Sequence, residues 1–107
     1  MEIVNDDAPI RVVAEAVLES KCRTVFVTNE NLVLHGSVTE GDLVRALLRG
    51  LNLDASVRHI MNSNPLYLLE GTSKEEARLL MARNGHSAIP IVDADRKVIK
   101  ILKQTEL

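Results

Sequence analysis

The chain has 107 residues, enough for one compact core of ordinary size. Hydrophobic residues make up 46% of it but aromatic residues only 2%, which predicts a core of Val, Leu, Ile, Ala and Met. Acidic and basic residues are interspersed and the formal net charge is -2, which argues against a nucleic acid or an anionic membrane as partner.

The first expected helix begins at Pro9, which suits the first helical position, and ends near Ser20. Its apolar residues have the spacing of one buried helix face: Ile10, Val13, Ala14, Val17 and Leu18. Two strands are expected next, Thr24–Thr28 and residues 32–38, joined by a short polar turn. A second helix is predicted over residues 40–49, ending at Gly50, with four inward side chains: Leu43, Ala46, Leu47 and Leu48.

The same order of elements then returns. Thr72 and Glu75 have the spacing of a capping box, and Gly85 closes the helix that they begin. The buried stripe of this helix is expected to contain Ala77, Leu80 and Met81. Strands are predicted over residues 87–93 and 97–102, with a turn between them.

Sliding the sequence by about 64 positions superposes the two halves. The matched pairs are Pro9 with Ser73, Val13 with Ala77, Val17 with Met81, Val25 with Ile89, Val27 with Ile91 and Asn29 with Asp93. The predicted fold is therefore α/β of the α+β kind, with two helix-strand-strand-helix repeats related by a pseudo-twofold axis. Each repeat has a small sheet packed on helices, over residues 1–53 and 54–107, and together they form one globular module.

The most informative motif runs from Gly36 to Asp42, where a strand leads into a helix. A carboxylate at Asp42 offers two acceptor oxygens to the adjacent hydroxyls of a ribose, and Thr39 with the first helical N–H groups can meet a phosphate. The same residues also fit an ordinary helix cap with an acidic residue in the first turn. Both interpretations stay open from these residues alone.

This repeat, with Gly36-x-x-Thr39-x-x-Asp42 in its first copy, resembles the cystathionine-beta-synthase (CBS) domain family over most of the chain. The resemblance implies a Bateman module, a regulatory pair of repeats that commonly forms a homodimer and is not an enzyme. It implies no required cofactor, but a site for AMP, ADP or ATP between the repeats. Thr39 would contact phosphate and Asp42 ribose, while Val38, Thr24 and Val25 would line the site of the base.

Residues 39–50 and 57–65 are also similar to CBS pairs attached to sugar nucleotidyltransferases and, less closely, to sugar-phosphate isomerases of the arabinose 5-phosphate type. The resemblance implies a regulatory appendage of an enzyme domain.

In the second copy, Lys100, Lys103 and Glu106 replace the Gly, Thr and Asp of the motif. We therefore expect a degenerate second site, whose terminal helix is truncated or missing.

Other chemistry-bearing residues point to no catalytic function. His35, His59 and His86 have no metal-ligand spacing, and Arg45 with Arg49 reads as a solvated helix face. The single Cys22 excludes an intrachain disulfide. The sequence also shows no targeting segment and no run of about 18 apolar residues. Together these three observations predict a cytoplasmic location. Two functions remain: a nucleotide-sensing regulatory module, or a structural dimerisation module without a bound ligand.

Overall fold

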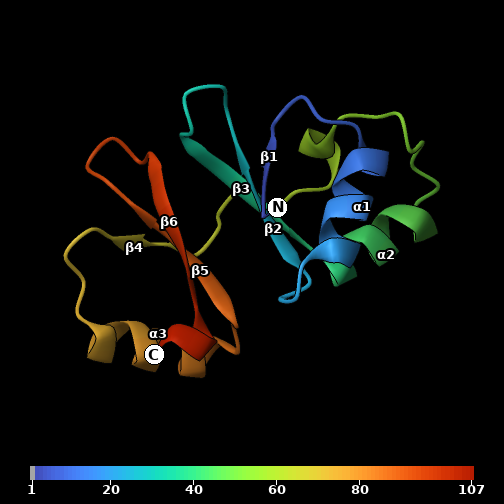
Figure 1. Cartoon of the computed structure of the whole chain (residues 1–107). Helices are drawn as coiled ribbons and strands as arrows, with labels where there is room; N and C mark the ends of the chain where they lie inside the picture. Colours follow the sequence, from blue (N-terminus) through green and yellow to red (C-terminus); the bar gives the residue numbers. More distant parts are fainter. Residues whose placement is uncertain (1) are drawn as a thin grey trace. The chain divides into compact units, whose positions relative to one another are not determined.

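The computed structural model describes residues 2–107, which form two compact units, one ending at Pro65 and one spanning Leu66–Leu107 (Figure 1). The first contains a three-stranded sheet of β1 (Ile3–Asn5), β2 (Thr24–Thr28) and β3 (Leu34–Thr39). The central strand β2 runs parallel to β1 and antiparallel to β3. Two helices, α1 (Ile10–Glu19) and α2 (Glu40–Leu48), lie on one side of this sheet (Figure 1).

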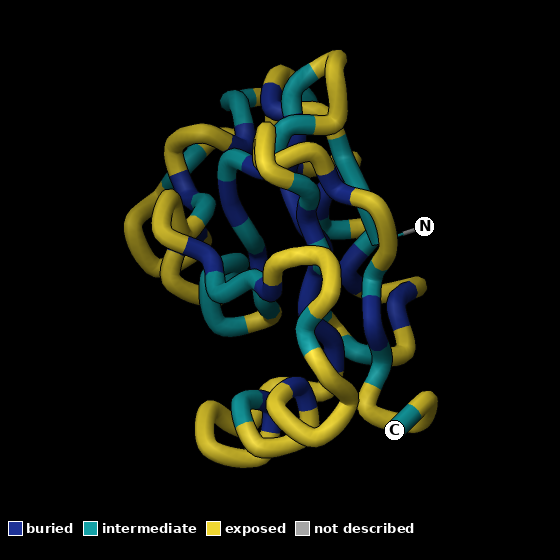
Figure 2. The backbone as a smooth tube through the Cα atoms, turned by 90° about the vertical axis from the view of Figure 1, so that its left-hand side faces the viewer, coloured by how far each residue is buried: buried dark blue, intermediate teal, exposed yellow. Residues whose placement is uncertain are grey.

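The core of the first unit forms where the helices meet the sheet. Its side chains come from α1, β2, β3, α2 and the short 3-10 helix η1 (Val57–His59). Figure 2 shows the burial along the chain, and β2, the central strand of the sheet, is buried over four of its five residues. The buried members are Ile10, Val13, Val17, Val25, Val27, Val38, Ala46, Val57 and Ile60.

The start of α1 is capped by a distant segment of backbone. The N–H groups of Ile10 and Arg11 have no partner within the helix, and they donate to the carbonyl oxygens of Ala55 and Leu53, each at 2.9 Å. Pro9 is the extended residue before the helix, not its first helical residue as the sequence predicted. Proline has no N–H group that would need a partner at this position. The two N–H groups that follow it are satisfied by the backbone of residues 53–55.

The expected boundary after residue 53 does not coincide with the two compact units. Residues 54–65 pack in the first unit, where Val57 is fully buried and Ile60 joins the core. The N–H of Val57 also donates to the carbonyl of Ala8 at 2.9 Å. This segment therefore contributes to the first core, although a division by sequence repeat assigns it to the second half.

The second unit repeats the sheet with fewer helices. Its strands are β4 (Leu68–Leu69), β5 (Ala88–Val92) and β6 (Val98–Lys103), again with the central strand parallel to one neighbour and antiparallel to the other. One α-helix, α3 (Lys74–Asn84), buries Ala77 and Met81 against this sheet. The chain ends in a 3-10 helix, η2 (Gln104–Glu106), at the position where α2 begins in the first unit.

The repeat predicted from the sequence is visible in matching details of the two sheets. The turn of each β-hairpin contains a polar residue, Asn29 or Asp93. Its side-chain Oδ1 accepts hydrogen bonds from two backbone N–H groups. The donors are Asn31 and Val33 in the first unit, and Asp95 and Lys97 in the second. Each hairpin also has a left-handed residue, Leu32 with φ 65° or Arg96 with φ 64°.

The predicted α+β class is confirmed, with two small sheets and three α-helices over residues 2–107. The structure adds β1 and β4, two short edge strands that the helix-strand-strand-helix pattern did not include.

Ser73, not Thr72, caps α3, since its hydroxyl accepts from the N–H of Glu76 at 3.1 Å. Thr72 instead donates to the carbonyl of Leu69. Among residues 2–107, no helix is long and apolar enough to cross a membrane.

Candidate functional site

Thr39 and Asp42 lie at the junction of β3 and α2, where they form a reciprocal capping box. The Asp42 Oδ2 accepts from the backbone N–H of Thr39 at 2.8 Å and from its hydroxyl at 3.1 Å. The backbone N–H of Asp42 approaches the hydroxyl oxygen of Thr39 at 3.4 Å. The capping interpretation is therefore present in the structure, and it orients the two side chains that a ribose and a phosphate would need.

A third residue reaches the same carboxylate. Arg45, one helical turn beyond Asp42, places its guanidinium Nη2 2.6 Å from the Asp42 Oδ1. The Asp42 side chain is 13% exposed and that of Arg45 is 66% exposed, so the carboxylate lies at the edge of solvent beneath the arginine. Arg45 is exposed, as expected of a solvated helix face, but it also pairs with Asp42, and the i, i+3 spacing of the two residues is the sequence signal of this pair.

Neighbouring charges at this junction are balanced. Glu40, which adds a negative charge beside Thr39, lies 3.6 Å from the guanidinium of Arg23, and both side chains are more than half exposed. Arg23 immediately precedes β2 and adopts a left-handed φ of 54°. This ion pair connects the ends of two adjacent strands and offsets the Glu40 charge that the sequence alone left uncompensated.

Thr24 lies beside Thr39, since these two residues are paired across β2 and β3. Its hydroxyl donates to the carbonyl of Cys22 at 3.1 Å. The turn before it is organised by the buried Ser20, whose hydroxyl donates to the carbonyl of Thr24 and accepts from the N–H of Cys22. The tight turn holds the first residue of β2 next to the motif.

Val25 and Val38 are also paired across the two strands, but their side chains are fully buried in the helix-facing core. A fully buried side chain offers no surface to a ligand in this conformation. Of the five residues expected in the site, Thr39, Asp42 and Thr24 therefore present partly exposed positions. Val25 and Val38 support the site through the sheet that carries it.

Gly36, the first residue of the motif, allows a close approach of backbone. A Cβ atom there would lie 2.7 Å from the Met61 Sδ and 2.8 Å from the carbonyl oxygen of Asn62. The next residue, Ser37, exchanges two backbone hydrogen bonds with Asn62, at 2.9 and 3.1 Å. Glycine is required here because residues 61–62 cross this edge of β3.

The corresponding junction of the second unit has different chemistry. Lys103 pairs with Ala88 as Thr39 pairs with Thr24, which places Glu106 at the position of Asp42. The carboxylate of Glu106 accepts from the Lys103 N–H and lies 3.0 Å from the Lys100 ammonium. The hydrogen bonds from Lys100 and from the Lys103 backbone lower the pKa of Glu106. This junction keeps the carboxylate but replaces the threonine hydroxyl by a lysine.

Asp6 forms a separate charged cluster at the end of β1. Its buried carboxylate lies 3.0 Å from the His35 Nδ1 and 3.1 Å from the Arg58 guanidinium. These contacts join the end of β1 to β3 and η1, so the cluster ties together parts of the first unit that are far apart in sequence. Within residues 2–107, no three His, Cys, Asp or Glu side chains are grouped as a metal site would require.

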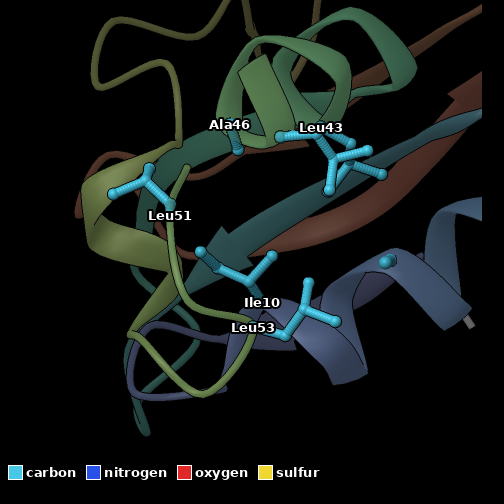
Figure 3. A pocket seen from close by; sticks show the side chains of 7 residues that line it. Ile10, Leu43, Ala46, Leu51 and Leu53 are labelled. Atoms are coloured by element: carbon cyan, nitrogen blue, oxygen red, sulfur yellow. The ribbon is translucent and has the colours of Figure 1, made fainter. Parts of the chain in front are cut away.

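An apolar pocket lies between α1 and α2 (Figure 3). Its walls include Ile10 and Ala14 of α1 and Leu43, Ala46 and Leu47 of α2. The segment after α2 closes it with Leu51 and Leu53. One of its lining residues, Leu47, is 65% exposed.

Three exposed leucines of α1 and α2 correct the sequence prediction. Leu18, Leu47 and Leu48 were expected on buried faces, but they are 66%, 65% and 82% exposed. A helix that packs on a sheet buries a narrow stripe, so residues at the edge of a wider apolar stripe remain outside. Val44 is also exposed, one turn before Leu48 on α2.

A family model described as the CBS domain matches residues 1–49 and again residues 57–107. The chain belongs to the CBS domain family. It is a tandem CBS pair, as the repeated hairpins and the Gly36-x-x-Thr39-x-x-Asp42 motif predicted, and CBS pairs are regulatory and not catalytic domains.

Known proteins with this fold include nucleotide complexes. The structure of CBSX2 in complex with AMP is 26% identical, with a TM-score of 0.81, over 98% of this chain and 82% of that one. The CBS domain protein PAE2072 from Pyrobaculum aerophilum, complexed with AMP, is 23% identical, with a TM-score of 0.79, over 98% of this chain and 81% of that one.

A curated relative is much longer than this chain. The uncharacterized protein YtoI of Bacillus subtilis (strain 168) is 25% identical over 81 residues, which are 76% of this chain. The chain spans 17% of the length of that relative.

Proposed function

We propose that this CBS pair is a regulatory module that binds an adenosine nucleotide at the Thr39 and Asp42 junction. The observation that carries the proposal is the partly exposed carboxylate of Asp42, held beside the Thr39 hydroxyl at the start of α2. The family membership supports it, as does the AMP complex of CBSX2, a CBS protein 26% identical to this chain. A ligand that binds two arrangements of the module unequally would bias a partner domain.

In this proposal, Asp42 accepts hydrogen bonds from the ribose hydroxyls, and Thr39 with the first N–H groups of α2 contacts a phosphate. Thr24 lines the site beside Thr39, and Val25 and Val38 lie beneath it. The local charge balance favours a ligand with few phosphates, because Arg23 pairs with Glu40 and Arg45 pairs with Asp42. AMP is therefore a better candidate than ATP.

The regulated partner is a further part of the proposal. We infer an attached enzyme domain, with a sugar nucleotidyltransferase as the first candidate. The support is the similarity of residues 39–50 and 57–65 to CBS pairs attached to such enzymes. The length of the relative YtoI shows that a matching segment can be a small part of a larger protein.

Replacing Asp42 with alanine tests the ligand site. We expect AMP to raise the melting temperature of the unmodified chain, because a ligand that binds the folded state stabilises it by mass action. Asp42→Ala should weaken AMP binding by at least about 10- to 150-fold, the range expected for losing a single hydrogen bond to a charged group. Isothermal titration calorimetry with AMP, ADP, ATP, S-adenosylmethionine and nucleotide-sugars measures this effect.

The control for this experiment is Glu106→Ala, which removes the corresponding carboxylate of the second unit and should leave AMP binding unchanged. Asp42→Asn is a second variant, because an amide oxygen can still accept from the N–H of Thr39 and preserve the cap. Absence of binding by the unmodified chain across the whole panel would refute the nucleotide-sensing function.

A second candidate function rests on the surface around the pocket of Figure 3. Val44, Leu47 and Leu48 are all more than half exposed on α2, and Leu18 of α1 lies one turn beyond the pocket residue Ala14. Several large apolar side chains exposed on neighbouring helices are typical of a protein interface. We propose that a second copy of the chain covers these side chains, giving the homodimer that the family resemblance implies.

Replacing Leu47 with lysine tests the dimer. We expect sedimentation velocity to show a dimer for the unmodified chain, and Leu47→Lys should weaken association at least about 10-fold, because it places a charge at an apolar contact. The control is Leu79→Lys, which changes a leucine of similar exposure on α3. A chain that stays monomeric at micromolar concentrations would contradict this function and leave the ligand site unaffected.

A further inference from the structure

The carboxylate of Asp42 has little free capacity for hydrogen bonds. Its two oxygens can accept about four hydrogen bonds. Oδ2 already accepts from the backbone N–H and the hydroxyl of Thr39, and Oδ1 accepts from Arg45. One position is therefore left, on Oδ1, whereas a ribose presents two adjacent hydroxyl groups.

The three existing contacts differ in how readily they can be given up. The two contacts with Thr39 belong to the capping box, and losing them would uncover the start of α2. The contact with Arg45 joins the carboxylate to a flexible side chain that is 66% exposed. An ion pair whose arginine reaches into solvent contributes little free energy, so the arginine is the contact that a ligand can displace.

The absence of a side chain at Gly41 leaves room for the guanidinium of Arg45. A Cβ atom at Gly41 would lie 3.4 and 3.5 Å from the two terminal nitrogens of Arg45 and 3.6 Å from the Thr39 hydroxyl. The guanidinium thus lies beside the turn between Thr39 and Asp42, in contact with the carboxylate that a ribose would bind.

We propose that Arg45 is an internal competitor for the sugar-binding carboxylate, and that a ligand with a ribose diol binds by displacing it from Asp42. The inference rests on the proposed nucleotide site and adds a residue that sets its affinity and its sugar specificity. With Arg45 in place, Oδ1 can accept one hydroxyl group; after its displacement, both hydroxyl groups find an acceptor. Arg45 therefore lowers the affinity for every ribonucleoside. It also reduces the difference in affinity between a ribonucleoside, which has two hydroxyl groups, and its 2′-deoxy counterpart, which has one.

Adenosine and 2′-deoxyadenosine are suitable probes, because they carry no phosphate that Arg45 could attract. We expect Arg45→Met to bind adenosine about 2- to 5-fold more tightly than the unmodified chain, the factor that corresponds to the strength of an exposed ion pair. The ratio of adenosine affinity to 2′-deoxyadenosine affinity should also rise. Added salt should tighten adenosine binding to the unmodified chain, because it screens the ion pair, but not to the variant.

The matched control is Arg49→Met, which removes the same charge one turn further along the chain and should change neither affinity nor the sugar ratio. Adenosine binding that is unchanged or weaker in Arg45→Met would overturn the competition and leave the nucleotide site standing. Absence of binding by both the unmodified chain and Arg45→Met, to adenosine and to AMP, would overturn the nucleotide site itself. Melting curves without ligand show whether each variant is folded.

Discussion

Gly36→Ala should destabilise the first unit by about 1–3 kcal/mol, the usual cost of forcing extra atoms into a packed site. The new Cβ would lie 2.8 Å from the carbonyl oxygen of Asn62, a backbone atom that cannot rotate away as a side chain can. Relief would require residues 61–62 to leave the edge of β3 and would weaken their two hydrogen bonds with Ser37. Urea unfolding measures the change in the free energy of unfolding.

The same motif supplies the control. Gly41→Ala makes the same chemical change five positions later, inside α2, where the nearest atoms are the mobile end of Arg45 at 3.4 Å. It should stabilise the chain by about 0.4–1 kcal/mol, since alanine restricts the unfolded chain and favours helix. A Gly36→Ala variant as stable as the unmodified chain would contradict the close approach of residues 61–62.

Val57→Asp should unfold the first unit. The Val57 side chain is fully buried in the core between the helices and the sheet. Burying a carboxylate without a partner costs several kcal/mol, a large part of the 5–15 kcal/mol by which a typical domain is stable. Hydrogen exchange measured by mass spectrometry should show loss of amide protection in residues 2–65, since Val57 belongs to that unit.

Val12→Asp is the control for this variant. It makes the same substitution on α1 at a side chain that is 48% exposed, and should cost less than about 1 kcal/mol. Exchange that stays slow in residues 2–65 of Val57→Asp would show that this segment is not part of the first core. Protection lost only in Leu66–Leu107 would place residue 57 with the second repeat, as the expected boundary after residue 53 did.

Several features of the fold were predictable from the sequence because their signals are local. The turns at Asn29 and Asp93 depend on a side chain that bonds its own backbone within four residues. The capping box at Thr39 and Asp42 likewise lies within one turn of helix. Since the hairpin turns recur at a constant offset, they also predicted the repeat, and the repeat together with the Gly36-x-x-Thr39-x-x-Asp42 motif carried the resemblance to the CBS family.

Edge strands and exposed leucines were harder to predict. β1 and β4 are three and two residues long, too short for a periodic pattern, and only their pairing with β2 and β5 makes them strands. Of the four side chains predicted to face inward on α2, Ala46 is buried, but Leu47 and Leu48 are exposed. Which leucines lie outside depends on how the helix is rotated against its neighbours.

By itself, the sequence determined the class of fold, the repeat and the motif that could recognise a nucleotide, because their signals lie within a few positions of one another and recur in the second half of the chain. Only the tertiary structure decided that residues 53–55 cap α1 and that residues 61–62 require glycine at position 36. Both contacts join residues far apart in the chain, so no local pattern of residues indicates them.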